Sequence, residues 1–453
     1  MLVVILHPEQ WNGGSDRCTI GMIKHFVSAG HRVVWYTTMI DDYWRNENFS
    51  GVEIRDAKLA LHPGDWFSQN VALAWQLVFS DLDPDLIVID HSASCVPMIK
   101  WRFPSVKVLF YCHFPQQLVT PSRFFLYRWY SKAIGLVEGT LFNSADIIMV
   151  NSHFTEKQFL RVMPDVCPSK LMVVYPPCDV DSMSIGNKPI GRKQRPSNQR
   201  YTFLSMNRFW PEKRIDIIVE AAAMLKSRDR RPRILLAGSV MPHIPESRIY
   251  HDLLKKMVVD LDVSDLIEFI DSPTETEKFV LYRQCDSVLY TPPNEHFGIV
   301  PIEALEQRRP VIVCNSGGPA ETVLEGVTGS KAGYDELLLT HIQGNLCLCP
   351  TDIFKPQTAK TGMRKSSGDK CFNLTKIEIP DGTLLAEAME QHMLRPLWPA
   401  LDNDDDYEFQ RKRFEFNFSL TGFRKRIDDA LAIMFPESRT SLSLSPSEAR
   451  THA

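Results

Sequence analysis

Short apolar runs alternate with helical patterns along the first 180 residues of the chain. The first run, LVVIL, covers residues 2–6, and a second, RVVWYTT, covers residues 32–38. Between them Ile20, Ile23 and Phe26 recur at the spacing of one helical face. A strand, a helix and a second strand form a βαβ unit, so the pattern predicts a parallel sheet covered by helices on both faces. Further strands are predicted at 86–90, 107–112, 146–150 and 171–175.

The second half of the chain repeats this rhythm after a change in composition. Residues 182–200 are rich in Gly, Pro, Ser and basic residues, which is typical of a linker. We therefore expect an N-terminal domain at 1–181 and a second domain at 201–400. Two doubly wound α/β domains would face each other across a cleft and bind ligands beyond the carboxyl ends of their strands. The strands of the second domain are predicted at 201–206, 233–238, 266–270, 287–292 and 310–314.

The remaining C-terminal segments have a different character. Residues 351–383 are polar and lack periodicity, and we expect an atypical insert at about 330–383. Apolar positions then return at helical spacing, which predicts a C-terminal helix over 407–435 that packs on one of the domains. Residues 436–453 end in SLSLSPSEARTHA, a composition typical of a disordered tail.

The composition of the 453 residues excludes several classes of protein. Hydrophobic content of 44% and charged content of 23% are typical of a soluble globular protein. The formal net charge is −4, so nucleic acid is not an expected partner. Ten cysteines are scattered along the chain, which favours free thiols over a disulfide framework or a metal site. The sequence contains no run of 18 apolar residues that would predict a membrane span.

The segment NEHFGIVPIEAL, residues 294–305, follows a predicted strand and carries two acids. Proline is tolerated only in the first turn of a helix, so Pro301 places the helix start between Gly298 and Val300. Glu295 then lies in the preceding loop, and Glu303 about one turn into the helix. The free N–H groups of such a helix start suit an anionic ligand, and a carboxylate can accept hydrogen bonds from sugar hydroxyls.

Spacing alone does not decide what these two acids do. Acidic residues also stabilise a helix N-terminus by ~0.3–1 kcal/mol without any ligand. The functional and the purely structural interpretations are therefore equally good at this point.

Other polar residues also stand between predicted strands and helices. Arg208 and Lys213 follow the strand at 201–206 and could grip a diphosphate, although each could equally be a solvated surface cation. Gly317 and Gly318, in NSGGP, are expected to expose backbone amides to a ligand. The last set comes from the first domain and consists of Gly13, Gly14 and His113. A lone histidine is more often structural, and the sequence holds neither a GxGxxG nor a P-loop pattern.

Taken together, these segments resemble family 4 retaining glycosyltransferases, which have the two-domain GT-B fold. The combination of YCHFP, MVNSHFTEKQF, SMNRFWPEK, LYTPPNEHFGIVPIEAL and VIVCNSGGPAETV is most similar to the dolichol-pathway mannosyltransferases that form α-1,3 and α-1,6 linkages. The resemblance covers roughly residues 1–330 and, more weakly, 407–435. NEHFGI is also similar to the related α-1,2-mannosyltransferases of the same pathway, which remain an alternative.

The resemblance implies a donor, an acceptor and a role for each candidate residue. The implied donor is GDP-mannose, and the implied acceptor is dolichol-diphosphate chitobiose that already carries one mannose, met at the cytosolic face of the endoplasmic reticulum membrane. Arg208 and Lys213 would bind the diphosphate, Glu303 the ribose, and Glu295 the transferred mannose, with His113 near the sugar. The implied donor site is completed by Gly13, Gly14, Phe297, Gly298 and Ile299. No metal or other cofactor is implied.

A lipid-linked acceptor requires that the enzyme meet a membrane surface. Residues 122–142 interleave aromatic and basic side chains, which is typical of an interfacial helix. The same helix could instead pack on its own domain. Other mannosyltransferases of the dolichol pathway are further expected partners. The candidate membrane contacts are Phe124, Phe125, Trp129 and Tyr130.

One departure from the family pattern keeps other functions open. GVTG at 326–329 is followed by SKAGYDELLLTHIQ, which looks like an insertion of about fourteen residues. A non-catalytic scaffold is one alternative, although the intact Glu295, Glu303, Arg208 and Lys213 favour an enzyme. A transferase for another donor, such as a UDP-sugar, is a second alternative because no motif here reads the base.

Overall fold

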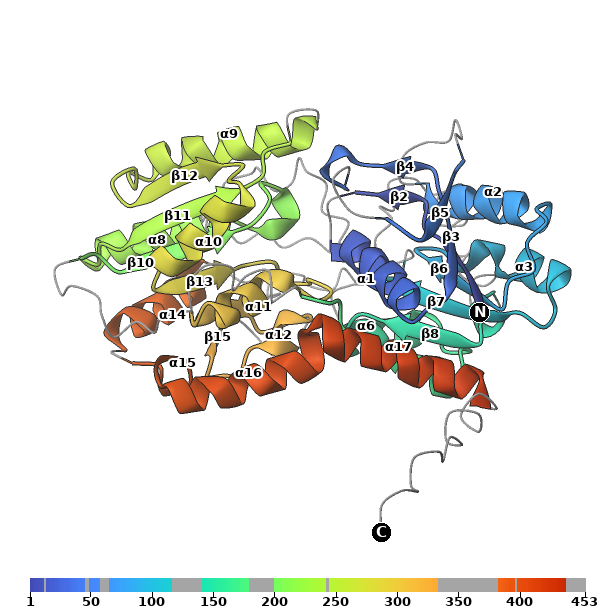
Figure 1. Ribbon diagram of the computed structural model, residues 1–453. Coiled ribbons are helices and arrows are strands. Elements are labelled where there is room, and N and C mark those ends of the chain that lie inside the picture. The colour runs from blue at the N-terminus through green and yellow to red at the C-terminus, as the bar shows by residue number, and fades with distance from the viewer. Residues whose placement is uncertain are drawn as a thin grey trace, which may run out of the picture. The chain divides into compact units, whose positions relative to one another are not determined.

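The computed structural model describes residues 1–11, 14–44, 49–57, 65–115, 141–178, 199–241, 244–332, 382–395 and 397–436. The chain divides into two units (Figure 1). Unit 1 contains residues 1–120, 124–179 and 412–453, and unit 2 contains residues 121–123 and 180–411. Each unit is built around one parallel sheet, as the alternation of strands and helices predicts.

The sheet of unit 1 has seven strands in the order β5-β3-β1-β6-β7-β8-β9. The strands are β1 (Leu2–Leu6), β3 (Arg32–Thr37), β5 (Val52–Asp56), β6 (Leu86–Asp90), β7 (Lys107–Cys112), β8 (Ile147–Val150) and β9 (Leu171–Val173). Every neighbouring pair is parallel. A separate pair of short strands joins β2 (Glu9–Gln10) to β4 (Met39–Ile40). The order reverses at β1, so the loops after β1 and β6 meet at the carboxyl edge of the sheet.

Helices cover both faces of this sheet, which explains why its central strands are continuously apolar. Side chains alternate between faces along a strand. Residues such as Leu6 and Ile89 pack under α2 (Trp66–Val78), α3 (Val96–Arg102) and α6 (His153–Val162). The alternate residues pack under α1 (Gly14–Ser28) and α17 (Leu420–Met434). The C-terminal helix α17 therefore completes the core of the N-terminal unit.

The sheet of unit 2 has six parallel strands in the order β12-β11-β10-β13-β14-β15. They are β10 (Thr202–Met206), β11 (Arg233–Gly238), β12 (Ile267–Asp271), β13 (Ser287–Tyr290), β14 (Val311–Cys314) and β15 (Gly329–Ala332). One face packs against α8 (Asp216–Ser227), α9 (Pro245–Asp260) and α14 (Gly382–Leu394). The remaining helices are α10 (Glu275–Gln284), α11 (Ile299–Glu306), α12 (Pro319–Thr322), α15 (Pro399–Asp402) and α16 (Asp404–Phe418).

All the predicted strands are present, with ends that differ by at most two residues, and the α/β fold class is confirmed. Strands β5 and β15 were not predicted, because both lie at sheet edges and carry few apolar residues. The single helix predicted over 407–435 was wrong, since α16 and α17 are separate helices. Ser419 separates them, and its hydroxyl accepts the Gly422 N–H at 3.0 Å as an N-cap of α17.

Several predicted segments lie outside the described residues. They are most of the linker at 182–200, most of the insert at 330–383, nearly all of the tail at 436–453, residue Gly13, and the candidate membrane contacts Phe124, Phe125, Trp129 and Tyr130. Within the part of the chain that the structure describes, no helix is both long and apolar enough to cross a membrane.

Candidate functional site

The loop between β13 and α11 has the backbone that the sequence predicts. Helix α11 begins at Ile299, and Gly298 is its N-cap, with φ of 83°. Only glycine adopts this left-handed region without strain. A Cβ on Gly298 would also lie 2.9 Å from Cε1 of the Tyr290 ring. The glycine thus serves the local packing of the loop, whatever ligand the loop binds.

A second glycine-containing loop, residues 315–318, packs against the loop between β13 and α11. A Cβ on Gly317 would lie 2.4 Å from the carbonyl oxygen of Glu295, and Gly317 has φ of 71°. The Gly318 N–H donates to that same carbonyl oxygen at 2.9 Å, and the Ser316 hydroxyl donates to the carbonyl oxygen of Pro293. The expectation that both glycines expose their amides to a ligand was wrong for Gly318, since its amide holds the Glu295 loop.

Lys213 and Glu295 meet beside the ring of Tyr290. The Lys213 ammonium forms an ion pair with the Glu295 carboxylate, and it lies 5.9 Å from the centre of the Tyr290 ring. The backbone of Lys213 is also fixed, because the Thr291 hydroxyl donates to its carbonyl oxygen at 2.7 Å. The structure therefore brings together Lys213 and Glu295, two residues predicted to bind the sugar-nucleotide donor, although they are 82 positions apart in the sequence.

The charges of this group reinforce one another. Burial alone would raise the pKa of Glu295, but Lys213, His296 and a hydrogen bond from Tyr290 hold that pKa below its ordinary value. Burial raises the pKa of Tyr290 well above its ordinary value, and the neighbouring Glu295 adds to this effect. Arg208 acts on the pKa of Tyr290 in the opposite direction, which places its charge near the same ring. Lys213 thus pairs with the ionised Glu295 carboxylate, and the charge of Arg208 acts on the neighbouring Tyr290.

Glu303 lies in a different environment from Glu295. It is 3% exposed and accepts hydrogen bonds from Lys278 Nζ at 2.7 Å and from the Tyr282 hydroxyl at 2.8 Å. Both partners lie on α10, one helical turn apart, and the sequence analysis missed them. Their i, i+4 spacing on a helix is the signal that could have drawn attention to them.

The other two predicted residues of this loop are apolar neighbours. Phe297 is buried and Ile299 is half-buried, so both support the loop by packing.

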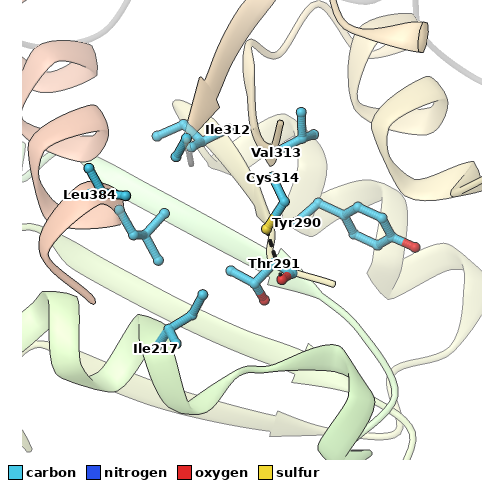
Figure 2. Close-up of a pocket in the computed structure, with 9 residues that line it drawn as sticks. Ile217, Tyr290, Thr291, Ile312, Val313, Cys314 and Leu384 are labelled. Carbon is cyan, nitrogen blue, oxygen red and sulfur yellow. Dashed lines mark hydrogen bonds between the residues drawn. The ribbon is translucent and has the colours of Figure 1, made fainter. Parts of the chain in front are cut away.

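An apolar pocket lies between the C-terminal parts of β13, β14 and β15 and the helices α8 and α14 (Figure 2). Its lining consists of Ile217, Tyr290, Thr291, Ile312, Val313, Cys314, Ala332, Leu384 and Leu385. The Cys314 thiol donates to the carbonyl oxygen of Thr291 at 3.1 Å across it. Tyr290 is shared between this pocket and the charged group around Glu295. The pocket itself offers no charged side chain, so it is not suited to a phosphate.

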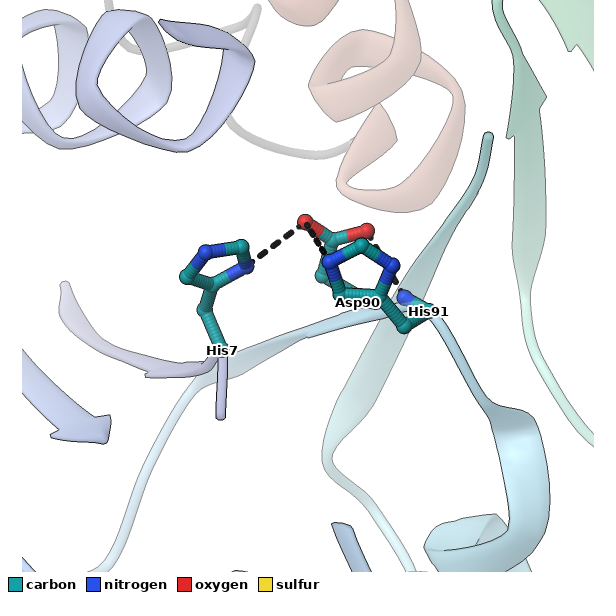
Figure 3. A group of neighbouring side chains, drawn as sticks. All are labelled: His7, Asp90 and His91. Carbon is teal, nitrogen blue, oxygen red and sulfur yellow. Dashed lines mark hydrogen bonds and ion pairs between the residues drawn. The ribbon is translucent and has the colours of Figure 1, made fainter. Parts of the chain in front are cut away.

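A second polar group occupies the carboxyl edge of the sheet in unit 1. His7 follows β1, Asp90 ends β6, His91 comes next, and His113 follows β7. Asp90 Oδ2 lies 2.8 Å from His7 Nδ1, and Asp90 Oδ1 lies 2.8 Å from His113 Nε2. Figure 3 shows His7 and His91 on either side of the carboxylate. Of this group the sequence analysis selected only His113. A polar residue directly after each buried apolar run was the available signal for the others.

The environment of each side chain sets its charge. Burial would lower the pKa of His7, but the carboxylates of Asp16 and Asp90 raise it from 6.5 to about 9. Burial would raise the pKa of Asp90, yet His113, His91 and His7 hold it well below its ordinary value. Burial lowers the pKa of His91 to about 4, so this ring is neutral at pH 7. The group therefore contains a fixed anion and a fixed cation.

The first turn of α1 is part of the same group. Gly14 begins the helix, and Asp16 accepts the Trp11 N–H at 3.0 Å while lying 3.4 Å from His7 Nε2. His7 thus has a carboxylate at each ring nitrogen. Ligand atoms of His7, Asp90 and His91 lie within 4.8 Å of one another, a spacing that could hold a metal ion. In this structure the same atoms form ion pairs and hydrogen bonds with Asp16, Thr19 and His113, so we describe the group as a network of charges and hydrogen bonds.

Two parallel α/β sheets with polar groups at their carboxyl edges agree with the comparisons with known proteins. Residues 12–182 match the family described as Glycosyltransferase Family 4, and residues 187–332 match Glycosyl transferases group 1. The solved structure of a glycosyltransferase from Rickettsia africae ESF-5 has a TM-score of 0.65 at 15% identity, covering 96% of this chain and 99% of that one. The protein is therefore a glycosyltransferase of the GT-B fold.

The curated relatives narrow this class further. The chain is 31% identical to the α-1,3/1,6-mannosyltransferase ALG2 of Homo sapiens over 349 residues, or 72% of this chain and 82% of the relative. It is 29% identical to that of Rhizomucor pusillus over 371 residues, or 72% and 79% of the two chains. The chain belongs to the family of α-1,3/1,6-mannosyltransferases. The resemblance seen in the sequence is thereby confirmed, and the chain is a hexosyltransferase.

Proposed function

We propose that this chain transfers mannose from GDP-mannose to the dolichol-diphosphate-linked Man1GlcNAc2 oligosaccharide. It would form an α-1,3 and then an α-1,6 linkage and retain the anomeric configuration, as expected for family 4 enzymes. The observation that carries the proposal is the ion pair of Lys213 and Glu295 beside Tyr290, at the carboxyl edge of the unit 2 sheet in a chain of this family, with the charge of Arg208 acting on the same tyrosine.

The donor diphosphate would bind to the two cations. Lys213 and Arg208 can each make charge-assisted hydrogen bonds to phosphate oxygens, which neutralise the charge that develops on the leaving group. Fixed cations of this kind stabilise the transition state without reorganisation, and the proposal requires no metal. Glu295 already holds Lys213 in position, and its carboxylate can accept a hydrogen bond from a mannose hydroxyl at the same time.

The ribose would be held by Glu303. A carboxylate has about four acceptor positions, and Lys278 and Tyr282 occupy two of them, so acceptor positions remain for a ribose diol. Because both partners come from the same helix, they also fix the direction in which the carboxylate points. On this view α10 sets the ribose contact and the loop at 293–298 sets the sugar contact.

Unit 1 would provide the acceptor side of the reaction. His113 would lie near the sugar, and Gly14 with Gly13 would allow the start of α1 to approach the donor phosphates. The lipid acceptor would be met at the cytosolic face of the endoplasmic reticulum membrane. Phe124, Phe125, Trp129 and Tyr130 are the proposed membrane contacts, and other mannosyltransferases of the pathway are proposed partners.

The test is transfer of radiolabelled mannose from GDP-mannose to mannosyl-chitobiosyl-diphosphate lipid. The expected products carry one and then two additional mannoses, and their linkages are read by linkage-specific mannosidases. UDP-glucose and UDP-mannose serve as donors in parallel reactions to test base selectivity. Absence of mannosylated lipid, with an active relative as positive control, would refute the proposal. Efficient transfer from a UDP-sugar would show that GDP-mannose is not the donor, while the proposed acceptor would stand.

A further inference from the structure

We propose that His7 is a positioning residue, which bridges Asp16 of α1 and Asp90 of β6 and thereby fixes the His113 ring. The catalytic part of this inference rests on the proposed function, in which His113 lies near the transferred sugar. The geometric part concerns only described residues of unit 1 and can be tested without any substrate.

The contacts of His7 form a continuous chain between two elements. Its ring is completely buried, with Nε2 3.4 Å from Asp16 Oδ1 and Nδ1 2.8 Å from Asp90 Oδ2. The second oxygen of Asp90 lies 2.8 Å from His113 Nε2. Asp16 stands in the first turn of the helix that follows the glycine loop. His7 therefore joins the start of α1 to His113 through a single intervening carboxylate.

Asp90 can transmit this contact because its orientation is fixed from several directions. The Thr19 hydroxyl donates to Asp90 Oδ2 at 3.1 Å, and the backbone N–H of His91 donates to Asp90 Oδ1 at 2.7 Å. The Asn70 amide donates to the Asp90 carbonyl oxygen at 2.8 Å. His91 adopts φ of 65°, a left-handed conformation that is strained for a residue other than glycine. Strain of this kind persists only where the surroundings hold it, which fits a carboxylate held in one orientation.

Charge explains why a histidine suits this position. The charged and titratable groups that face His7 are Asp16 from α1 and Asp90 with His91 from the end of β6. Two buried carboxylates would repel each other and draw in water or protons without a cation between them. An imidazolium has an N–H at each ring nitrogen, so Nδ1 can hydrogen-bond to Asp90 at 2.8 Å while Nε2 lies at ion-pair distance, 3.4 Å, from Asp16. The rigid ring sets the distance between the two carboxylates. A side chain that reaches only one carboxylate leaves the other without this support.

Two amide substitutions separate the two contacts of His7. The amide nitrogen of asparagine occupies the place of Nδ1, so His7→Asn keeps a donor to Asp90 and loses the one to Asp16. The amide nitrogen of glutamine occupies the place of Nε2, so His7→Gln keeps a donor to Asp16 and loses the one to Asp90. We expect His7→Gln to move the ring ¹⁵N resonances of His113 and to lower kcat at least ten-fold at unchanged KM for GDP-mannose. His7→Asn should leave the His113 resonances near those of the wild type and retain more kcat.

His25 provides a matched control. It lies on the same helix α1 and also pairs with a carboxylate, at 2.7 Å from Asp428, but this pair belongs to the packing of α1 on α17. His25→Asn should reduce stability without moving the His113 resonances or kcat. Circular dichroism and the urea midpoint of each variant establish that the fold is intact. Equal loss of kcat in His25→Asn and His7→Gln would show that the effect is only structural.

The experiment distinguishes failure of the inference about His7 from failure of the proposed function. Unmoved His113 resonances in His7→Gln overturn the inference, whatever the activity. Absence of mannose transfer by the wild type refutes the proposed function, while the resonances still decide the role of His7. If the His7 variants do not fold, Thr19→Val keeps the His7 side chain and removes the hydroxyl that bonds Asp90 Oδ2 at 3.1 Å and contacts His7 Nδ1 at 3.2 Å. A shifted His113 resonance in that variant then supports the relay through Asp90, and an unshifted one overturns it.

Discussion

The stability of the protein should depend on pH in a way that His7 dictates. In the folded chain the pKa of His7 is raised from 6.5 to about 9, and its side chain is completely buried. Since the folded state holds the proton more tightly than the unfolded state, this group contributes stability that is fully present below pH 6.5. That contribution is lost as the pH rises from 6.5 to about 9.

The size of this contribution follows from the pKa difference. A pKa change of one corresponds to 1.36 kcal/mol, so a rise from 6.5 to about 9 corresponds to about 3 kcal/mol. His91 acts in the opposite pH range, because its pKa falls to about 4 in the folded state. Its neutral form stabilises the fold above pH 6.5, and this stability is lost as the pH falls toward 4. The two histidines together predict maximal stability near pH 6.5.

The contribution of His7 to the free energy of unfolding can be measured by urea denaturation of the wild type and His7→Asn at half-unit steps from pH 6 to 9.5. The difference in unfolding free energy between them should shrink by about 3 kcal/mol across this range, with a steepest slope near 1.4 kcal/mol per pH unit. The comparison cancels the titration of the groups that do not interact with His7; Asp16, Asp90 and His91 do interact with it. Parallel pH profiles from 6.5 to 9 would show that His7 is neutral in the folded protein and would refute the reasoning.

Four further variants, one of them a control, test the remaining predictions. Lys213→Ala would remove the proposed charge-assisted phosphate contact and should lower kcat/KM for GDP-mannose by about 10- to 150-fold, from ~1.5–3 kcal/mol; a near-normal kcat/KM would contradict this role. Lys226→Ala, which removes an exposed cation paired with Asp265, should leave turnover unchanged. Gly317→Ala combines φ of 71° with a Cβ 2.4 Å from the Glu295 carbonyl oxygen, so the urea midpoint should fall by an equivalent of about 1–3 kcal/mol, and an unchanged midpoint would contradict this. Replacing Trp129 and Tyr130 together by Ser should reduce flotation with anionic liposomes and leave GDP binding intact; unchanged flotation would exclude these residues as the membrane contact.

Local signals in the sequence were sufficient for the elements and for one helix start. Pro301 and Gly298 fix the beginning of α11, because proline and positive φ act on the backbone within a few residues. The buried strands were found for the same reason, since a strand covered on both faces is apolar throughout. The edge strands β5 and β15 were not predicted, because a half-exposed edge strand does not need a continuous apolar run.

The contacts that hold the candidate sites could not be found from local patterns. Glu303 meets Lys278 and Tyr282 only because α10 packs beside α11, and nothing in the sequence near Glu303 records that packing. His7 and Asp90 are 83 residues apart, and they meet because β1 and β6 are neighbours in the sheet. The role first given to Gly318 failed in a similar way, since its amide partner lies on a loop more than twenty residues away.

Each unit keeps one carboxylate ionised by placing a cation beside it. A parallel sheet gathers the loops that follow its strands along one edge, so polar residues distant in sequence meet where backbone groups are also free. In unit 2 this edge holds the ionised Glu295 against Lys213, and in unit 1 it holds the ionised Asp90 between His7 and His113. A buried carboxylate without a cation would take up a proton and lose its fixed direction. The cation beside each carboxylate is therefore what keeps it a charged acceptor with a defined orientation, the property that the proposed contacts of Glu295 with a mannose hydroxyl and of Asp90 with His113 require.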